Sequence, residues 1–119
     1  MLKTEDVRKV LVDLAASHGD TQMQEGTGCY YRGYNGEPLC IVGHVLARLE
    51  PEFFRKIPVS RNCGELNSRT IAEVIADGRL LAERDAATLL TYAQTYQDSG
   101  ASWARSVGWA VEELKRRHG

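Results

Sequence analysis

Two apolar patterns with the spacing of an α-helix stand on either side of one tight turn near the end of this chain. The first predicts a helix over 83–98 with a core face of Ala86, Leu89, Leu90, Ala93 and Tyr96 or Gln97. The second predicts a helix after Ser102 with an apolar stripe of Trp103, Val107, Ala110, Val111 and Leu114. Because the short turn Ser99-Gly100 joins them, the two helices are expected to pack antiparallel.

Three earlier segments also show helical spacing. The stretch from Thr4 to His18, with Thr4 as N-cap and a left-handed Gly19 at its end, has an apolar face of Val7, Val10, Leu11 and Leu14. The stretch after Ile41 predicts a short buried helix on Val42, Val45, Leu46 and Leu49. Thr70 and Glu73 form a capping box that begins a third helix, which Gly78 ends. The predicted fold is therefore mainly α, a bundle-like domain of about five helices.

One β-hairpin is predicted over residues 29–40. Asn35-Gly36 is a strong two-residue hairpin signal, because both turn positions need a positive φ. Pro38 lacks an N–H group, so the returning strand must be short or lie at an edge. A lone hairpin is marginal in water, and this one is expected to pack on the helices.

Length and composition restrict the class of protein. The 119 residues predict a single domain over 1–119, and 43% hydrophobic with 26% charged residues is typical of a globular chain. The apolar runs are too short for a membrane span, and the acidic start of the chain lacks a secretory signal, so a cytoplasmic location is expected. A net charge of −1 makes nucleic-acid binding an unlikely role.

A metal site is one alternative that the cysteines leave open. Cys40 and His44 are spaced i, i+4 on one predicted helix, and Cys29 and Cys63 would complete a Cys₃His set for zinc. The gaps between the cysteines do not match a zinc-finger spacing, and no Cys-x-x-Cys pair is present. Three reduced, buried thiols are the competing interpretation.

The sequence is compatible with two further activities. Cys40 at a helix N-terminus, with His44 as base, could form a nucleophilic site, although a base one turn along the same helix is poorly aimed at the thiol. The helices around Gly78 could form a helix-turn-helix, but Glu83 and Asp85 would then stand where DNA phosphates should lie. No catalytic residue is assigned.

The predicted hairpin carries the preferred interaction surface. It gathers Tyr30, Tyr31, Arg32 and Tyr34, and tyrosine and arginine are enriched in binding hot spots. Trp109 is a second candidate, because it lies about 100° from the centre of the last helix's apolar stripe. The first of these surfaces predicts contact with a partner protein.

Two segments together resemble a known group of proteins. One runs from Gly28-Cys29 through Asn35-Gly36 to Cys40-Ile41-Val42-Gly43-His44, and the other combines Gln97-Asp98, Gly100 and Trp103. Over roughly residues 5 to 112 the chain is similar to small hypothetical proteins encoded by actinobacterial phages, prophages and host genomes. The resemblance implies a phage context and no biochemical activity.

These observations together predict a non-enzymatic, intracellular protein-binding module. With the phage context, it would be an accessory protein that engages a host protein in the host cytoplasm. The alternatives are a zinc-stapled regulatory domain, a DNA-binding regulator and a Cys40-dependent enzyme, and a homo-oligomer is also compatible with the sequence.

Overall fold

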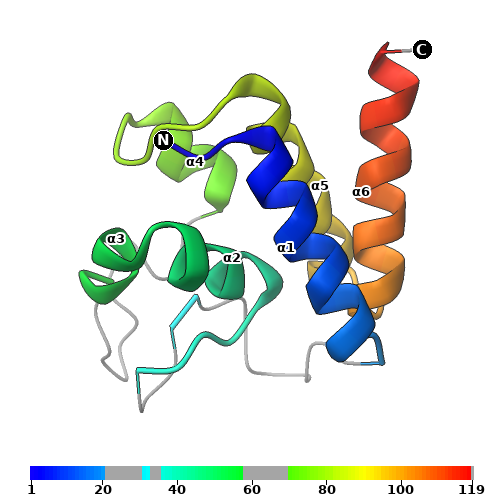
Figure 1. Ribbon diagram of the computed structural model, residues 1–119, viewed down its shortest axis with the longest axis horizontal. Helices are drawn as coiled ribbons and strands as arrows, with labels where there is room; N and C mark the ends of the chain where they lie inside the picture. Colours follow the sequence, from blue (N-terminus) through cyan, green and yellow to red (C-terminus); the bar gives the residue numbers. More distant parts are fainter. Residues whose placement is uncertain (21–30, 33–35, 58–69, 119) are drawn as a thin grey trace.

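The computed structural model describes residues 1–20, 31–32, 36–57 and 70–118. Within these ranges the chain forms six helices and is mainly α, as predicted (Figure 1). They are α1 (Thr4–Ser17), α2 (Ile41–Leu49), α3 (Pro51–Arg55), α4 (Ile71–Ala76), α5 (Arg84–Asp98) and α6 (Trp103–His118).

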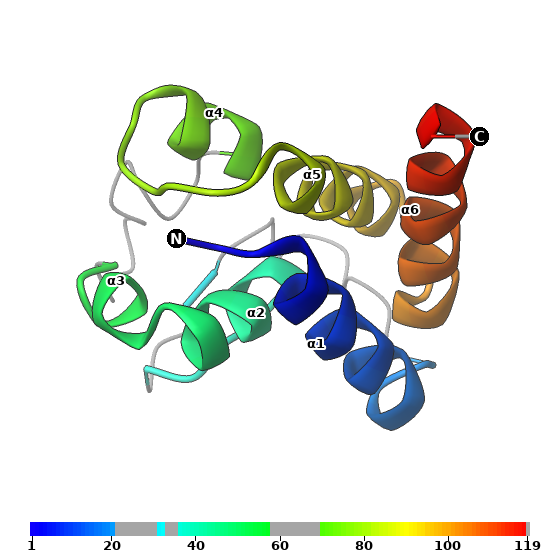
Figure 2. The same ribbon diagram turned by 45° about the horizontal axis from the view of Figure 1, so that its top comes forward.

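Helix α5 is the centre of the arrangement. It packs against α6, α1, α4 and α2, while α3 packs on α2 (Figure 2). Helices α5 and α6 run antiparallel around a turn in which Gly100 has a φ of 97°, a value that favours glycine. At the far end of the pair, His118 on α6 contacts Asp85 on α5 at 2.9 Å. The antiparallel pair predicted from the sequence is confirmed.

The predicted apolar faces form one core. The buried side chains of α1 are Val7, Val10, Leu11 and Leu14, and those of α6 include Trp103, Val107, Ala110 and Leu114. The capping box of α4 is also present, because Thr70 and Glu73 satisfy each other's backbone amides. Truncating a fully buried leucine such as Leu11 to alanine would cost about 2–5 kcal/mol of stability.

The N-terminal residues are held by a distant segment. Leu2 is buried and forms an isolated parallel bridge with Ala82, in which the Leu2 N–H donates to the Leu81 carbonyl and the Glu83 N–H donates to the Leu2 carbonyl. The side chain of Glu83 then accepts a hydrogen bond of 2.6 Å from the Thr4 N–H. The predicted N-cap role of Thr4 is wrong: Lys3 precedes the helix, and Glu83 supplies the cap from another part of the chain. Gly19 is likewise outside the left-handed region, since the positive φ angles of the described glycines lie at 36, 78 and 100.

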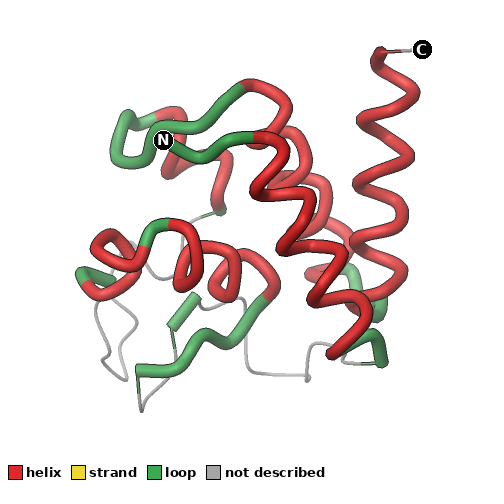
Figure 3. The backbone as a smooth tube through the Cα atoms, viewed as in Figure 1, coloured by secondary structure: helices red, strands yellow, loops and turns green. Residues whose placement is uncertain are grey.

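The predicted hairpin is not confirmed. In the described residues Arg32 and Pro38 form one isolated antiparallel bridge, and these residues contain no strand or sheet (Figure 3). Residues 29–30 and 33–35, which include Asn35 of the predicted turn, lie outside the described residues. Pro38 has no N–H to donate, which limits pairing on this segment, and the Leu39 N–H donates to the Tyr31 carbonyl at 3.1 Å.

None of the helices in the described ranges combines the length and the apolar content that crossing a bilayer requires.

Candidate functional site

Tyr31 lies in the core of the domain. Its side chain is 1% exposed, and its hydroxyl accepts a hydrogen bond of 3.1 Å from Gln94 Nε2 on α5. Its backbone packs directly on Gly43 of α2, where an added Cβ would stand 2.2 Å from the Tyr31 carbonyl oxygen. The structure therefore places this tyrosine in helix packing and away from any surface a partner could reach. Tyr30 and Tyr34 lie outside the described residues.

Arg32 is half-buried and bound to main-chain carbonyls. Its Nη1 donates to the carbonyls of Arg55 and Ile57 at 2.8 and 3.0 Å, and its guanidinium lies over the Phe54 ring. Arg55 is the last residue of α3 and Ile57 lies just beyond it, where the last carbonyls of a helix lack an intrahelical partner. Arg32 therefore caps α3, and most of its hydrogen-bonding capacity is already used within the domain.

Cys40 and His44 occupy neighbouring turns of α2 but differ in environment. Cys40 is the N-cap of α2; its buried thiol sulfur accepts a hydrogen bond of 3.3 Å from the Gly43 N–H. His44 is half-buried and faces His18 and Trp103. Cys29 and Cys63, the other members of the predicted zinc set, lie outside the described residues. Within the part of the chain that the structure describes, no three His, Cys, Asp or Glu side chains gather as metal ligands.

Burial changes the acidity of His44. Desolvation, followed by the charges of His18 and Arg48, lowers the pKa of His44 from 6.5 to about 4. Its imidazole is therefore neutral near neutral pH. An imidazole with so low a pKa is a weak general base for Cys40, whose thiol is also shielded from solvent.

A row of aromatic side chains crosses from α5 to α6. Tyr92 and Tyr96 are one turn apart on α5, with ring centroids 6.1 Å apart, and Trp109 of α6 meets the Tyr96 ring edge-on at 5.0 Å. Arg117 ends the row: its Nη2 donates to the Tyr92 hydroxyl at 2.8 Å, and its guanidinium lies over the same ring. We refer to Tyr92, Tyr96, Trp109 and Arg117 as the aromatic face.

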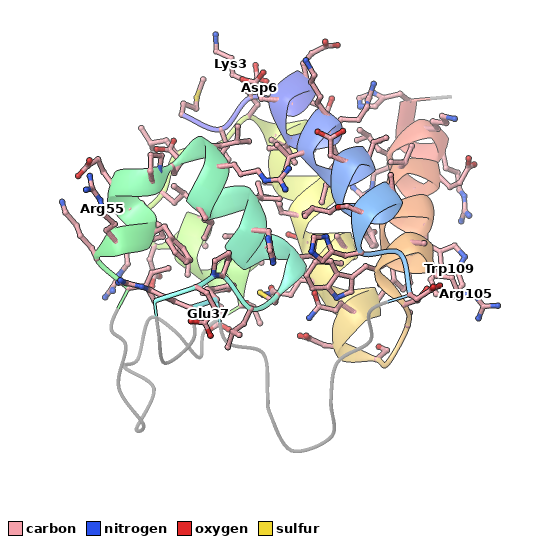
Figure 4. All side chains as sticks on the ribbon, turned by 60° about the horizontal axis from the view of Figure 1, so that its bottom comes forward. Lys3, Asp6, Glu37, Arg55, Arg105 and Trp109 are labelled. Atoms are coloured by element: carbon pink, nitrogen blue, oxygen red, sulfur yellow. The ribbon has the colours of Figure 1, made fainter. Side chains whose placement is uncertain are left out.

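The aromatic face is accessible along its length. Trp109 is 45% exposed, and Tyr92 and Tyr96 are half-buried. Figure 4 shows Trp109 and Arg105 close together at the outer side of α6. Trp109 and Arg117 are eight residues apart, so the row extends about 12 Å along α6. The partial exposure predicted for Trp109 is confirmed. Of the two alternatives for the core face of α5, Gln97 is buried and Tyr96 is half-buried, and Tyr92 was not identified from the sequence.

A groove continues from one end of this face. It has a volume of about 460 Å³ and is lined by Ile75, Ala82, Arg84, Ala87, Thr88, Thr91, Tyr92 and Arg117. Arg84 and Arg117 are its only charged lining residues, and neither forms an ion pair with a carboxylate in the described residues. The nearby acids of α6 are already matched, since Glu112 pairs with Lys115 and Glu113 with Arg116. The groove therefore offers apolar and aromatic surface with a local positive charge.

Comparisons with protein-family models, with curated proteins and with solved structures found no match.

Proposed function

We propose that this chain is a non-enzymatic protein-binding module, and that the aromatic face with the adjoining groove is its binding surface. The observation that carries the proposal is the partly exposed row of Tyr92, Tyr96, Trp109 and Arg117 across two packed helices. Tryptophan, tyrosine and arginine are the residues in which interface hot spots are most enriched. A row that is already ordered by mutual contacts loses little conformational entropy when a partner binds.

The charge of the groove selects the kind of partner. In the described residues Arg84 and Arg117 form no salt bridge with a carboxylate, although the charge of Glu113 acts on Arg117. An acidic group can therefore pair with them without breaking a salt bridge. We therefore expect an acidic segment of another protein, with an apolar or aromatic side chain seated against Trp109. The similarity to actinobacterial phage proteins stays a prediction, and it directs the search for this partner to the proteins of a bacterial host.

The alternative of a Cys40-dependent enzyme has weaker support. Its thiol is 3% exposed and is engaged with the Gly43 N–H, and His44 beside it holds a neutral, weakly basic imidazole. Reactive cysteines sit in partly exposed, electropositive surroundings. We therefore favour binding over catalysis.

The test selects peptides that bind the protein and then reverses the charge of the two groove arginines. The purified protein is used to select from a random displayed-peptide library, and selected peptides are expected to be rich in Asp and Glu and to contain an aromatic residue. Trp109→Ala should then weaken the best peptide about 30-fold, the equivalent of a 2 kcal/mol hot spot. The double variant Arg84→Glu with Arg117→Glu should weaken it further and should reverse the selected charge.

Val12→Ala is the matched control. Val12 is an exposed hydrophobic residue on α1, 52% exposed, and is far from the aromatic face in sequence and on a different helix. This variant should bind like the parent protein. Selection of basic or uncharged peptides, equal binding by Trp109→Ala, or preferential binding of nucleic acid would overturn the proposal. Light scattering that shows a dimer held through Trp109 would also contradict it, since a second copy would then be the occupant.

A further inference from the structure

Three aromatic rings from distant parts of the chain meet beside the N-terminal ends of α2 and α6. His18 directly follows α1, His44 lies in α2, and Trp103 is the first residue of α6. The ring centroids of His18 and His44 are 5.3 Å apart, and Trp103 lies 5.4 Å from His18 and 5.3 Å from His44. Two imidazoles are thus held next to each other with an indole ring against both.

We propose that His18 and His44 together bind one divalent transition-metal ion that favours imidazole nitrogen, such as Zn²⁺ or Co²⁺. The spacing of the rings is the first argument. With a metal–nitrogen distance near 2.0–2.1 Å and tetrahedral angles, two imidazoles on one ion have centroids about 5.2 Å apart. The observed centroid distance of 5.3 Å agrees with this separation.

The hydrogen bonds of His18 provide the second argument. The Ser17 hydroxyl donates its hydrogen to the Asp13 carbonyl at 2.9 Å, so Ser17 Oγ accepts the hydrogen bond of 2.8 Å that it shares with His18 Nδ1. Nδ1 therefore carries the proton, and the lone pair of the neutral ring lies on Nε2. Metal-binding histidines are oriented in this way, with the second nitrogen donating to a neighbouring oxygen.

His44 keeps its ring nitrogens available. Its imidazole makes no hydrogen bond to any residue in the described ranges, although it is half-buried. Either ring nitrogen of His44 can therefore take a ligand without breaking a hydrogen bond to a described residue.

Solvent can reach His18 from the α1 side. An open hollow of about 620 Å³ is lined by Ala15, Ala16, Ser17, His18, Gly19, Asp20 and Ala104. Two protein nitrogens leave the other coordination positions to water, as in open and exchangeable metal sites. This site shares His44 with the Cys₃His set considered from the sequence, but its second ligand is His18.

The experiment uses Trp103 as the reporter of metal binding. The chain has two tryptophans, so Trp109→Phe leaves Trp103 alone. Co²⁺ added to this protein should quench the Trp103 fluorescence and saturate at one equivalent, and Zn²⁺ should restore the emission by displacing Co²⁺. The visible absorption of bound Co²⁺ should be that of nitrogen and oxygen ligands, without thiolate charge-transfer bands.

Variants then identify the ligands. In the Trp109→Phe background, His18→Gln and His44→Gln should each weaken Co²⁺ binding by more than about tenfold. The controls are His118→Gln, which removes the third histidine at the far end of α6, and Cys40→Ala, and both should bind as the parent does. Arg48→Ala should tighten binding, on the order of twofold, because it removes a cation that already acts on His44.

Circular dichroism of each variant shows whether it remains folded, and a folded His18→Gln or His44→Gln variant with parental affinity overturns the site. Thiolate bands on Co²⁺ binding, or loss of binding in Cys40→Ala alone, would assign the metal to cysteine and overturn it as well. The site is also overturned if Co²⁺ at up to millimolar concentration does not quench the Trp103 fluorescence.

Discussion

Gln97 Oε1 on α5 accepts a hydrogen bond of 2.8 Å from the backbone N–H of Ile41, the first residue of α2. One turn earlier on α5, Gln94 Oε1 accepts from the N–H of Ile71, the first residue of α4, also at 2.8 Å. The first N–H groups of a helix have no partner within it. Two buried glutamines on the central helix therefore supply, from a distance, a cap for two other helices.

Replacing Gln97 with leucine is expected to destabilise the protein by about 1–3 kcal/mol, because a buried Ile41 N–H then loses its acceptor. The free energy of unfolding in urea measures the effect. Thr95→Ala, an exposed change on the same helix, is the control and should stay within about 0.5 kcal/mol of the parent. Equal stabilities for the two variants would mean that the Gln97 cap contributes nothing.

Gly43→Ala is expected to destabilise the protein by about 1–3 kcal/mol or more, since its Cβ would stand 2.2 Å from the Tyr31 carbonyl oxygen. Gly108→Ala is the matched substitution, because Gly108 lies within α6 with open space around its Cα. It should raise stability by about 0.5–1 kcal/mol through helix propensity. Thermal unfolding followed by circular dichroism compares them; a neutral Gly43→Ala would show that Tyr31 does not pack as described.

Stability should fall as the solution is acidified, through His44. Its pKa is 6.5 in the unfolded chain and about 4 in the folded protein, so below 6.5 the unfolded state binds the proton first. The loss of stability begins near the pKa of His44 in the unfolded chain and levels off below about pH 4, the pKa of His44 in the folded protein. Because the ring is only half-buried, we expect about 1 kcal/mol between about pH 7 and pH 5. His44→Phe should reduce the pH dependence by this amount in urea unfolding at both pH values, and an unchanged dependence would contradict the assignment.

The two tryptophans should differ in their effect on stability. Trp103 is 3% exposed, and Trp103→Ala is expected to cost about 3–5 kcal/mol. Trp109→Ala removes a half-exposed ring and one edge-on contact with Tyr96, so it should cost only about 1 kcal/mol. Unfolding of both variants in guanidinium checks that Trp103→Ala loses more stability than Trp109→Ala. A large loss for Trp109→Ala would place this residue in the core and weaken its use as a binding probe.

The helices and the core faces could be predicted from the sequence because their signals are local. The face of α1, the capping box of α4 and the pair around Gly100 depend on residues within a few turns of each other. The cap of α1 was missed for the opposite reason. Glu83 supplies it from 79 residues away, and nothing near Thr4 indicates this.

The candidate site was predicted only in part. Sequence alternation places Tyr31 and Arg32 on opposite faces of a strand, but it does not say that helices cover Tyr31 or that Arg32 caps α3. The pairing of His44 with His18 depends on how α1 packs on α2, which no local pattern encodes. Trp109 was identified because its position on α6 lies off the apolar stripe.

The hydrogen bonds between the N-terminal residues and the segment before α5 also affect when the domain can fold during its synthesis. Leu2 and Thr4 find their backbone partners only at Leu81 and Glu83. At about 5–20 residues per second, a ribosome needs roughly 4–16 s to add the residues between them. During that interval α1 lacks its cap, and the parts of its surface that pack on α5 and α6 are not yet covered. The domain is thus expected to complete its fold only after Leu81 and Glu83 have been translated.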